Sequence, residues 1–338
     1  MDKILISVII PAYNIAPYIG RCLDSLIMQE HTNIEIIVVN DGSMDDTGEI
    51  INRYAKRDSR IKPIHKENGG VTSARIAGIQ ASKGTYIGFV DGDDYVDSDM
   101  FRRLLKNALK YNADISHCGY KMVFPNHVDY YYDTGRLVEQ NKITGLKDLL
   151  EGSFIEPCLC NKLIHNSLFH NLLNDNLMPQ SVKNNEDVLM NYWLFKEANR
   201  SIYEDFCPYH YILRKGSAAT SKLNEHKLKD PILVTKIMLN DSEKMLDVYN
   251  ILMKRLVRQL VDVSTMGTTE KYEWLVIFQK QVRKELRELS NSYLIDSEES
   301  LLFKIKLLWA TYFPTSYRWV HTLYSKITGL DKKYEIEE

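Results

Sequence analysis

The chain has 338 residues, of which 44% are hydrophobic and 26% charged, and its formal net charge is −2. This balance is ordinary for a globular protein with one large core or two smaller ones, and it gives no overall electrostatic reason to bind nucleic acid. Five cysteines in a chain of this length do not make a disulfide framework, and Cys158 and Cys160 lack a second ligand pair for zinc, so we expect reduced thiols. The sequence shows no signal peptide and no apolar stretch of roughly 18 residues, which predicts a cytoplasmic protein that at most lies on the inner face of the plasma membrane.

The first part of the chain alternates β-branched apolar runs with helical patterns. We expect strands at residues 4–10, 34–39, 61–65, 86–90 and 115–123, and helices at residues 17–28, 71–81 and 97–110. Repeated strand–helix–strand order predicts an α/β fold with a mostly parallel sheet flanked by helices. In such sheets ligands bind beyond the carboxyl ends of the strands, so the polar clusters that follow these strands are expected to meet at one edge.

The strand at residues 86–90 ends in an acidic cluster. Asp91 and Asp93 are two residues apart, so in an extended segment they point the same way, and Gly92 permits a sharp turn between them. Such carboxylates are hard oxygen ligands, suited to Mg²⁺ or Mn²⁺ shared with a phosphate, although an acidic surface turn has the same composition. The other polar clusters expected at this edge favour the metal site.

The second part of the chain changes character. Residues 142–222 mix helical segments with aromatic strands such as residues 209–213, and from about Leu223 the pattern is helical and charged. The change in composition near Ser221 predicts a domain boundary, with domains at residues 1–221 and 222–338.

Four segments of the first domain resemble, in the family's order, motifs of the family 2 glycosyltransferases with the GT-A fold, of the type that builds bacterial capsule, exopolysaccharide and cell-wall glycans. These segments are Val8-Ile9-Ile10-Pro11-Ala12-Tyr13-Asn14, Val39-Asn40-Asp41-Gly42-Ser43-Met44-Asp45-Asp46-Thr47, Asn68-Gly69-Gly70-Val71-Thr72-Ser73-Ala74-Arg75 and Val90-Asp91-Gly92-Asp93-Asp94. The resemblance covers about the first 220 residues. It implies a GT-A catalytic domain that binds a nucleotide sugar with residues 1–125 and the acceptor with residues 126–221.

The resemblance also implies which residues bind the donor. Asp41 resembles the residue that accepts the uracil N–H, and Tyr13 the residue stacked near the base, although ordinary loop packing explains Tyr13 equally well. The remaining candidates of these motifs for nucleotide-sugar binding are Pro11, Asn14, Asn68, Gly69, Arg75, Asp91 and Gly92. Of these, Arg75 is expected to face the diphosphate. The family usually continues with Asn after this arginine, whereas the chain has Ile76.

By the same resemblance, Asp93 is the expected direct ligand of Mn²⁺ or Mg²⁺. Asp91 is expected to approach the ribose or the water shell of the metal, and Asp94 to support the loop. The metal would bridge the phosphates and stabilise the departing UDP.

A second acidic pair, Glu186 and Asp187, resembles the family's Glu-Asp pair at the acceptor pocket. Transfer requires a base that takes the proton of the attacking hydroxyl, and Asp187 is the candidate, with Glu186 holding Asp187 or the acceptor. Acids at a helix start also favour the helix dipole, and both roles are compatible. Arg214 or His210 is expected to cover the diphosphate, unless this segment is an aromatic strand with solvated basic residues, and Lys162 lies beside the acceptor pocket or makes a structural ion pair.

The sequence therefore predicts an inverting, non-processive hexosyltransferase that moves a hexose or N-acetylhexosamine from a UDP-sugar to a glycan or lipid-linked glycan. Two alternatives are an enzyme that extends glycans on protein and a non-catalytic scaffold that binds nucleotide sugars. In the helical domain, residues 301–327 are rich in Leu, Phe, Trp and Tyr and contain no acid. This pattern fits an acceptor contact, a dimer contact or a membrane interface beside anionic lipids.

Overall fold

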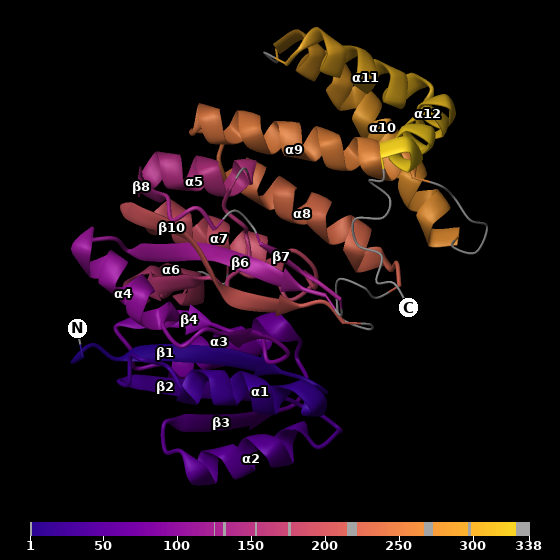
Figure 1. Ribbon diagram of the computed structural model, residues 1–338. Coiled ribbons are helices and arrows are strands. Elements are labelled where there is room, and N and C mark those ends of the chain that lie inside the picture. The colour runs from indigo at the N-terminus through magenta and orange to yellow at the C-terminus, as the bar shows by residue number, and fades with distance from the viewer. Residues whose placement is uncertain are drawn as a thin grey trace. The chain divides into compact units, whose positions relative to one another are not determined.

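The computed structural model describes residues 2–124, 126–130, 133–152, 154–174, 177–214, 222–266, 273–296 and 299–328 (Figure 1). Its internal contacts divide the chain into two compact units, Met1–Ser221 and Lys222–Glu338. The division falls between the same two residues as the expected boundary, and the role of the second unit stays a prediction.

The first unit begins with four parallel strands, as expected for an α/β fold. In the sheet they lie in the order β3 (Ile61–Lys66), β2 (Ile34–Asp41), β1 (Ile6–Ala12) and β4 (Tyr86–Phe89). The helices of this part are α1 (Ala16–Ile27), α2 (Thr47–Arg57), α3 (Val71–Ala81) and α4 (Met100–Lys110). Because the four strands are parallel, their carboxyl ends share one edge of the sheet.

Beyond β4 the sheet becomes mixed. Strand β9 (Lys162–His165) lies antiparallel between β4 and β6 (Ile115–Val123), and β10 (Arg200–Ile212) is parallel to β6. Three short strands, β5 (Tyr95–Val96), β7 (Val128–Tyr130) and β8 (Leu137–Asn141), complete a ten-stranded sheet. The helical segments of this part are α5 (Lys142–Glu151), η1 (Asn166–Leu168), α6 (Phe169–Asn174) and α7 (Glu186–Glu197).

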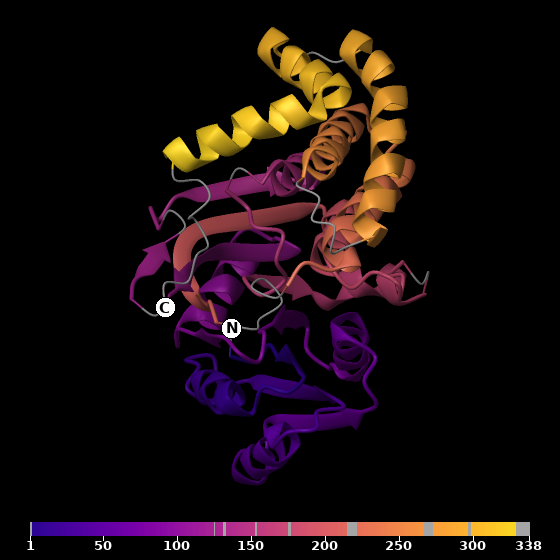
Figure 2. The same ribbon diagram turned by 90° about the vertical axis from the view of Figure 1, so that its right-hand side faces the viewer.

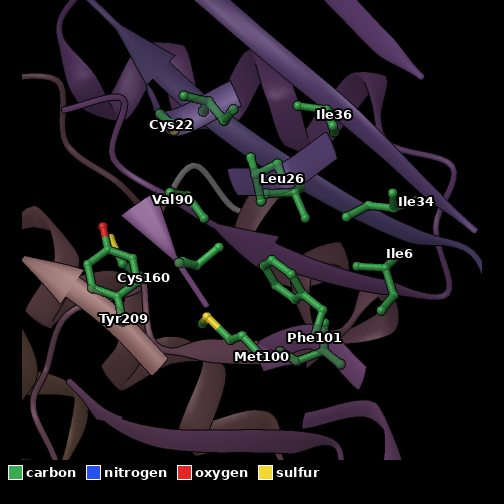
Figure 3. Packing of buried hydrophobic residues seen from close by; sticks show 14 of the residues in the cluster. Ile6, Cys22, Leu26, Ile34, Ile36, Val90, Met100, Phe101, Cys160 and Tyr209 are labelled. Carbon is green, nitrogen blue, oxygen red and sulfur yellow. The ribbon is translucent and has the colours of Figure 1, made fainter. Parts of the chain in front are cut away.

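The helices pack closely on the sheet, and this packing positions the start of α3. On one face of the sheet, Ile6 of β1 packs in a buried cluster with Leu26 of α1 and Phe101 of α4 (Figure 3). On α3, a Cβ placed on Gly78 would lie 2.3 Å from Cγ2 of Ile9, so this glycine lets the helix pack directly on the sheet. The close packing fixes the first turn of α3 at the carboxyl edge of the strands.

The second unit is helical. It contains α8 (Glu225–Asp241), α9 (Leu246–Thr265), α10 (Glu273–Asp296), α11 (Leu301–Tyr312) and α12 (Pro314–Thr328). Helix α9 packs against α8 and α10, and α11 and α12 both contact α9. The last two helices meet at an angle, with the chain turning at Phe313 (Figure 2). Among the described residues, no helix has both the length and the apolar character needed to cross a membrane.

Candidate functional site

The loops that follow β1 and β2 are tied together at the carboxyl edge. Asn14 has a left-handed backbone with φ of 49°. Its amide N–H donates to the Ser43 hydroxyl at 3.0 Å, and its side-chain oxygen accepts from the Met44 amide at 2.8 Å. The neighbouring Tyr13 is 49% exposed, so its ring is free to meet a ligand at this edge. Pro11 lies near the end of β1, and its carbonyl oxygen would lie 3.2 Å from a Cβ on Gly92.

Asp41 ends β2 and anchors the loop that precedes α3. Its Oδ1 accepts hydrogen bonds from Lys66 Nζ at 2.6 Å and from the amide of Gly69 at 3.0 Å, and its Oδ2 accepts from the amide of Gly70 at 2.8 Å. Asn68 lies so close to Gly42 that a Cβ on that glycine would stand 2.7 Å from the Asn68 nitrogen. The buried carboxylate of Asp41 therefore holds Gly69 in place, and Asn68 packs against the residue that follows Asp41. These three candidates for nucleotide binding, distant in sequence, lie together.

The acidic loop after β4 is held by β10. Asp94 is buried, accepts from the Tyr209 hydroxyl at 2.6 Å and accepts from the Ile212 amide at 2.8 Å. Burial and the charges of Asp91 and Asp93 raise the pKa of Asp94 well above its usual range. Two hydrogen bonds and burial make Asp94 a structural support of the loop, as expected.

Asp93 is a partly exposed carboxylate of this loop. Arg214 approaches it with Nε at 2.9 Å and with a terminal nitrogen at 2.7 Å. Burial and the charge of Asp91 raise the pKa of Asp93, and Arg214 lowers it. The structure thus brings Arg214 to the acidic loop, while the Lys215, Gly216 and Ser217 that continue this segment lie outside the described residues.

Arg75 joins the acidic loop to the start of α7. One of its terminal nitrogens lies 3.1 Å from Oδ1 of Asp91, and the other lies 2.9 Å from Oε1 of Glu186. The Arg75 side chain is only 5% exposed. Burial lowers its pKa, but the two carboxylates raise it further, so the pKa lies above its usual value and the guanidinium stays charged. The Nε of Arg75 is buried without a hydrogen-bond partner among the described residues.

Asp187 follows Glu186 in the first turn of α7. Its Oδ1 accepts from the Val188 amide at 2.8 Å, and burial together with the charge of Glu186 raises the pKa of Asp187 to about 7, while Arg75 opposes this rise. Asn185 precedes the helix with a φ of 62° and makes no side-chain cap, so the two acids also provide the negative charge that suits a helix start. Asp187 is consequently a carboxyl group that gains and loses its proton near neutral pH.

The acidic loop provides the kind of ligand that a divalent cation prefers. Asp91 and Asp93 are partly exposed carboxylates at 33% and 23%, and the pKa of Asp93 is raised by its acidic neighbour. A cation between them and a diphosphate would relieve this repulsion, so the residues fit such an ion. Within the described part of the chain, no three His, Cys, Asp or Glu side chains cluster as a metal site.

Two other candidate residues, His210 and Lys162, bond to other groups of the first unit. His210 stacks on Tyr95 and bonds to Oδ1 of Asp97 at 2.7 Å, so of the two candidates for a diphosphate cover only Arg214 reaches Asp93. Lys162 is fully buried, and its Nζ donates to the carbonyls of Glu156 at 2.8 Å and Cys158 at 2.6 Å. Lys162 therefore holds a turn of the backbone, and among the described residues no carboxylate pairs with it. Its place beside the acceptor pocket stays a prediction.

Ile76 lines a cavity of about 410 Å³ beside the first turn of α3. The other side of this cavity is the segment that precedes α7, including Met178 and Val182. Gly69 and Lys183 also line the cavity, and no carboxylate belongs to its lining among the described residues. Ile76 occupies the position where the family that the sequence resembles usually has Asn. Its apolar side chain therefore lines the cavity beside the candidate site.

Three residues of the site were not expected from the sequence. The Cys160 thiol donates to Oδ2 of Asp91 at 3.2 Å, Lys66 pairs with Asp41, and the Tyr209 hydroxyl accepts from the Asp91 amide at 3.2 Å. Cys160 and Lys66 lie in no recognisable motif, and in the aromatic-basic segment that begins at Tyr209 the expected roles fell on His210 and Arg214 instead.

Comparison with known proteins identifies the family of the first unit. The family model described as "Glycosyl transferase family 2" matches residues 7–173. The chain is 57% identical over 116 residues to the uncharacterized glycosyltransferase EpsJ of Bacillus subtilis, a match that covers 34% of each chain. It is 46% identical over 115 residues to the glycosyltransferase GlyA of Streptococcus pneumoniae, covering 34% of this chain and 16% of that protein. The chain thus matches about a third of the length of the first relative and less of the second.

Solved structures show the same fold. TarS of S. aureus in complex with UDP-GlcNAc superposes with a TM-score of 0.73 at 23% identity, over 95% of this chain and 91% of that one. The mannosyltransferase PcManGT of Pyrobaculum calidifontis, in complex with GDP-Man and Mn²⁺, gives a TM-score of 0.52 at 14% identity, over 82% and 83% of the two chains. The chain has the GT-A fold, and its first unit, which the family model matches over residues 7–173, belongs to glycosyl transferase family 2.

Proposed function

We propose that this protein is an inverting, metal-dependent and non-processive glycosyltransferase. It moves a hexose or N-acetylhexosamine from a UDP-sugar to a hydroxyl of a glycan or lipid-linked glycan in bacterial surface polysaccharide synthesis. The observation that carries the proposal is the contact of Arg75 with both Asp91 and Glu186, at 3.1 and 2.9 Å. Through this one guanidinium, the acidic loop for the donor and the candidate base Asp187 belong to a single site.

The donor nucleotide would lie along the loops that follow β1, β2 and β4. The exposed Tyr13 is available to the base, and the backbone anchored by Asp41 is available to the ribose and uracil. UDP as the nucleotide is supported by TarS, the neighbour with the higher TM-score of the two reported, which was solved with UDP-GlcNAc. Arg75 and Arg214 would face the diphosphate, since guanidinium groups match phosphate geometry with paired hydrogen bonds.

Asp93 would hold Mn²⁺ or Mg²⁺, with Asp91 at the ribose or at the water shell of the metal. When bound, the ion would supply positive charge for the diphosphate that leaves as UDP. The Mn²⁺ in the structure of PcManGT supports a divalent cation in this fold. Because Arg214 contacts Asp93, it would also neutralise part of the charge that develops on the leaving group.

Asp187 would accept the proton of the acceptor hydroxyl. As that O–H bond breaks, the oxygen forms a bond to the anomeric carbon, and the bond from this carbon to the diphosphate oxygen breaks on the opposite side. A single displacement of this kind inverts the anomeric configuration. The pKa of Asp187 near 7 suits a general base at neutral pH, and Glu186, held by Arg75, would position the acceptor or Asp187 itself.

The proposal is tested by incubating the protein with a panel of UDP-sugars and measuring UDP release, with Mn²⁺ and with a chelator. We expect release with at least one sugar, dependent on the cation, and its loss in Asp187→Asn with UDP binding retained. The matched control Asp129→Asn changes a carboxylate that is 59% exposed on β7 and is expected to keep full activity. UDP binding without any release from the panel would favour the scaffold alternative instead, and a product with retained anomeric configuration would contradict a single displacement.

A transferase that extends glycans on protein would use the same donor site and differ only in its acceptor. Assays with polyprenyl-linked sugars and with glycopeptides as acceptors separate these two activities. The cavity beside Ile76, which is lined by polar and apolar side chains and by Lys183, is large enough to receive part of a sugar acceptor.

A further inference from the structure

Helix α11 presents an apolar stripe away from its packing side. Its buried residues, Leu307 and Ala310, lie on the side that contacts the rest of the second unit. The stripe recurs at positions i, i+4, i+7 and i+11 and consists of Leu301, Ile305, Leu308 and Tyr312, which are between 41% and 75% exposed. This spacing places the four side chains on one face of the helix.

Helix α12 carries a second set of exposed apolar side chains. They are Trp319, Val320, Leu323 and Tyr324, which are between 50% and 73% exposed, and the pairs 319/323 and 320/324 stand one turn apart. Phe313, at the turn between the two helices, is 66% exposed. A soluble unit rarely leaves so many large apolar side chains unpartnered on neighbouring helices, so these faces are expected to meet another surface.

Basic side chains outnumber acidic ones around these helices. Residues 301–328 contain no Asp or Glu, and Lys306 is exposed on α11. On α10, a shallow groove of about 400 Å³ is lined by Lys280, Arg283, Lys284, Arg287 and Glu288. Burial and the charges of Arg287 and of Arg318 on α12 lower the pKa of Arg283, which shows that the positive charge extends from α10 to α12.

We propose that this surface, formed by the exposed faces of α11 and α12 with the basic side chains of α10, binds a lipid bilayer that contains anionic headgroups. Aromatic and aliphatic side chains would enter the boundary between headgroups and acyl chains, while lysine and arginine would contact lipid phosphates. A second copy is less suitable as the partner, because a twofold contact brings each basic patch against its own copy. The helices would lie on the bilayer, consistent with their length and charge.

The proposal is tested by cosedimentation of the full chain with vesicles of phosphatidylcholine alone and of phosphatidylcholine with phosphatidylglycerol. We expect binding to the anionic vesicles, weakened by salt. The double variant Trp319→Ser/Leu323→Ser is expected to lower the partition coefficient by about tenfold or more, since it removes two inserted side chains. The control Leu246→Ser changes an apolar side chain on α9 that is 70% exposed and outside the proposed surface, and it is expected to bind like the wild type.

A charge test addresses the basic side. The triple variant Lys280→Glu/Lys284→Glu/Arg287→Glu is expected to lose the preference for phosphatidylglycerol. The same change of charge at Lys56, Lys106 and Lys110, which are exposed on α2 and α4 of the first unit, serves as the control and is expected to keep the preference. Each variant is expected to keep the fold, because all these side chains are exposed. Thermal unfolding of each variant checks this expectation.

Insertion is read directly from Trp319, one of four tryptophans in the chain. Brominated acyl chains are expected to quench the fluorescence of the wild type, and the quenching is expected to be largely lost in Trp319→Phe. Several results would overturn the proposal: no binding to anionic vesicles, equal loss of binding in the controls, or absence of quenching. A vesicle-independent dimer that Trp319→Ser/Leu323→Ser converts to a monomer would overturn it as well, since it would assign the surface to a second copy.

Discussion

Arg75 donates a hydrogen bond of 2.9 Å to Glu186 across 111 residues of sequence. The arginine comes from α3, which packs directly on the sheet, and the glutamate opens α7 in the later part of the unit. With its other terminal nitrogen the same guanidinium reaches Asp91. Two carboxylates that would otherwise be poorly solvated thus share one buried cation.

Replacing Arg75 with methionine leaves Asp91 and Glu186 without their cation. Breaking a buried pair by removing one partner costs about 3–5 kcal/mol, and we expect a loss of this size in the free energy of unfolding, measured by urea denaturation. Arg102→Met is the control, because its ion pair with Glu30 is about half exposed on both sides and contributes at most about 1 kcal/mol. A loss in Arg75→Met no larger than in the control would contradict the structural role of the guanidinium.

The proton of Asp187 is expected to set the pH dependence of transfer. The base works only when ionised, and its pKa is raised from 3.8 to about 7, so kcat/KM is expected to rise with pH and level off above about 7. Glu186→Gln removes a charge that raises this pKa, and we therefore expect the midpoint to move to lower pH. Glu197→Gln, at the other end of α7, is the control and should leave the midpoint in place. The measurement is kcat/KM against pH under limiting substrate.

Asp93→Asn is expected to abolish the response of the enzyme to Mn²⁺. A cation that stabilises a leaving diphosphate contributes several kcal/mol to the barrier, so activity at saturating Mn²⁺ is expected to fall by about 100-fold or more. Asp97→Asn is the control, because Asp97 is a nearby carboxylate whose partners are Lys121 and His210. Activity of Asp93→Asn that still rises with Mn²⁺ to the wild-type level would assign the cation to another residue.

Asp41→Asn tests the anchor of the loop before α3. The carboxylate accepts from Lys66 and from the amides of Gly69 and Gly70, and hydrogen bonds to a charged group contribute about 1.5–3 kcal/mol each. We expect the Kd for UDP, measured by calorimetry, to rise by about tenfold or more when this charge is removed. Asp46→Asn, which changes an exposed residue directly before α2, is expected to bind UDP as the wild type does.

His117 is expected to make the first unit sensitive to acid. Burial and the charge of Lys162 lower its pKa from 6.5 to about 3, although a hydrogen bond from or to Gln140 opposes the shift. The folded state therefore binds fewer protons than the unfolded state between these values, so stability is complete above pH 6.5 and is lost as the pH falls towards 3. Each pH unit in this window costs about 1.4 kcal/mol at most.

The measurement for His117 is the free energy of unfolding from urea denaturation between pH 7 and pH 4.5, for the wild type and for His117→Gln. The variant is expected to lose part of the pH dependence. His127→Gln is the control, since His127 is 57% exposed and lies outside the core. An unchanged pH dependence in His117→Gln would show that other groups cause the acid sensitivity.

The sequence by itself determined the first four strands and their helices. Runs such as residues 4–10 and 34–39 are apolar throughout because both faces of a parallel strand are covered, and this pattern is local. The order of strands and helices then placed Asn14, Asp41 and Asp91 at one edge, since parallel strands end on the same side. The motifs of the acidic loop and of the loop before α3 were likewise visible in single short segments.

The tertiary structure decided how these groups are paired. Strand β9 has only four residues and includes the buried Lys162, so no periodic pattern indicated that it inserts antiparallel between β4 and β6. The contacts of Arg75 with Glu186 and of Arg214 with Asp93 join residues more than 100 positions apart. Such pairs depend on packing and on burial of charge in three dimensions. A local pattern of residues carries no information about either.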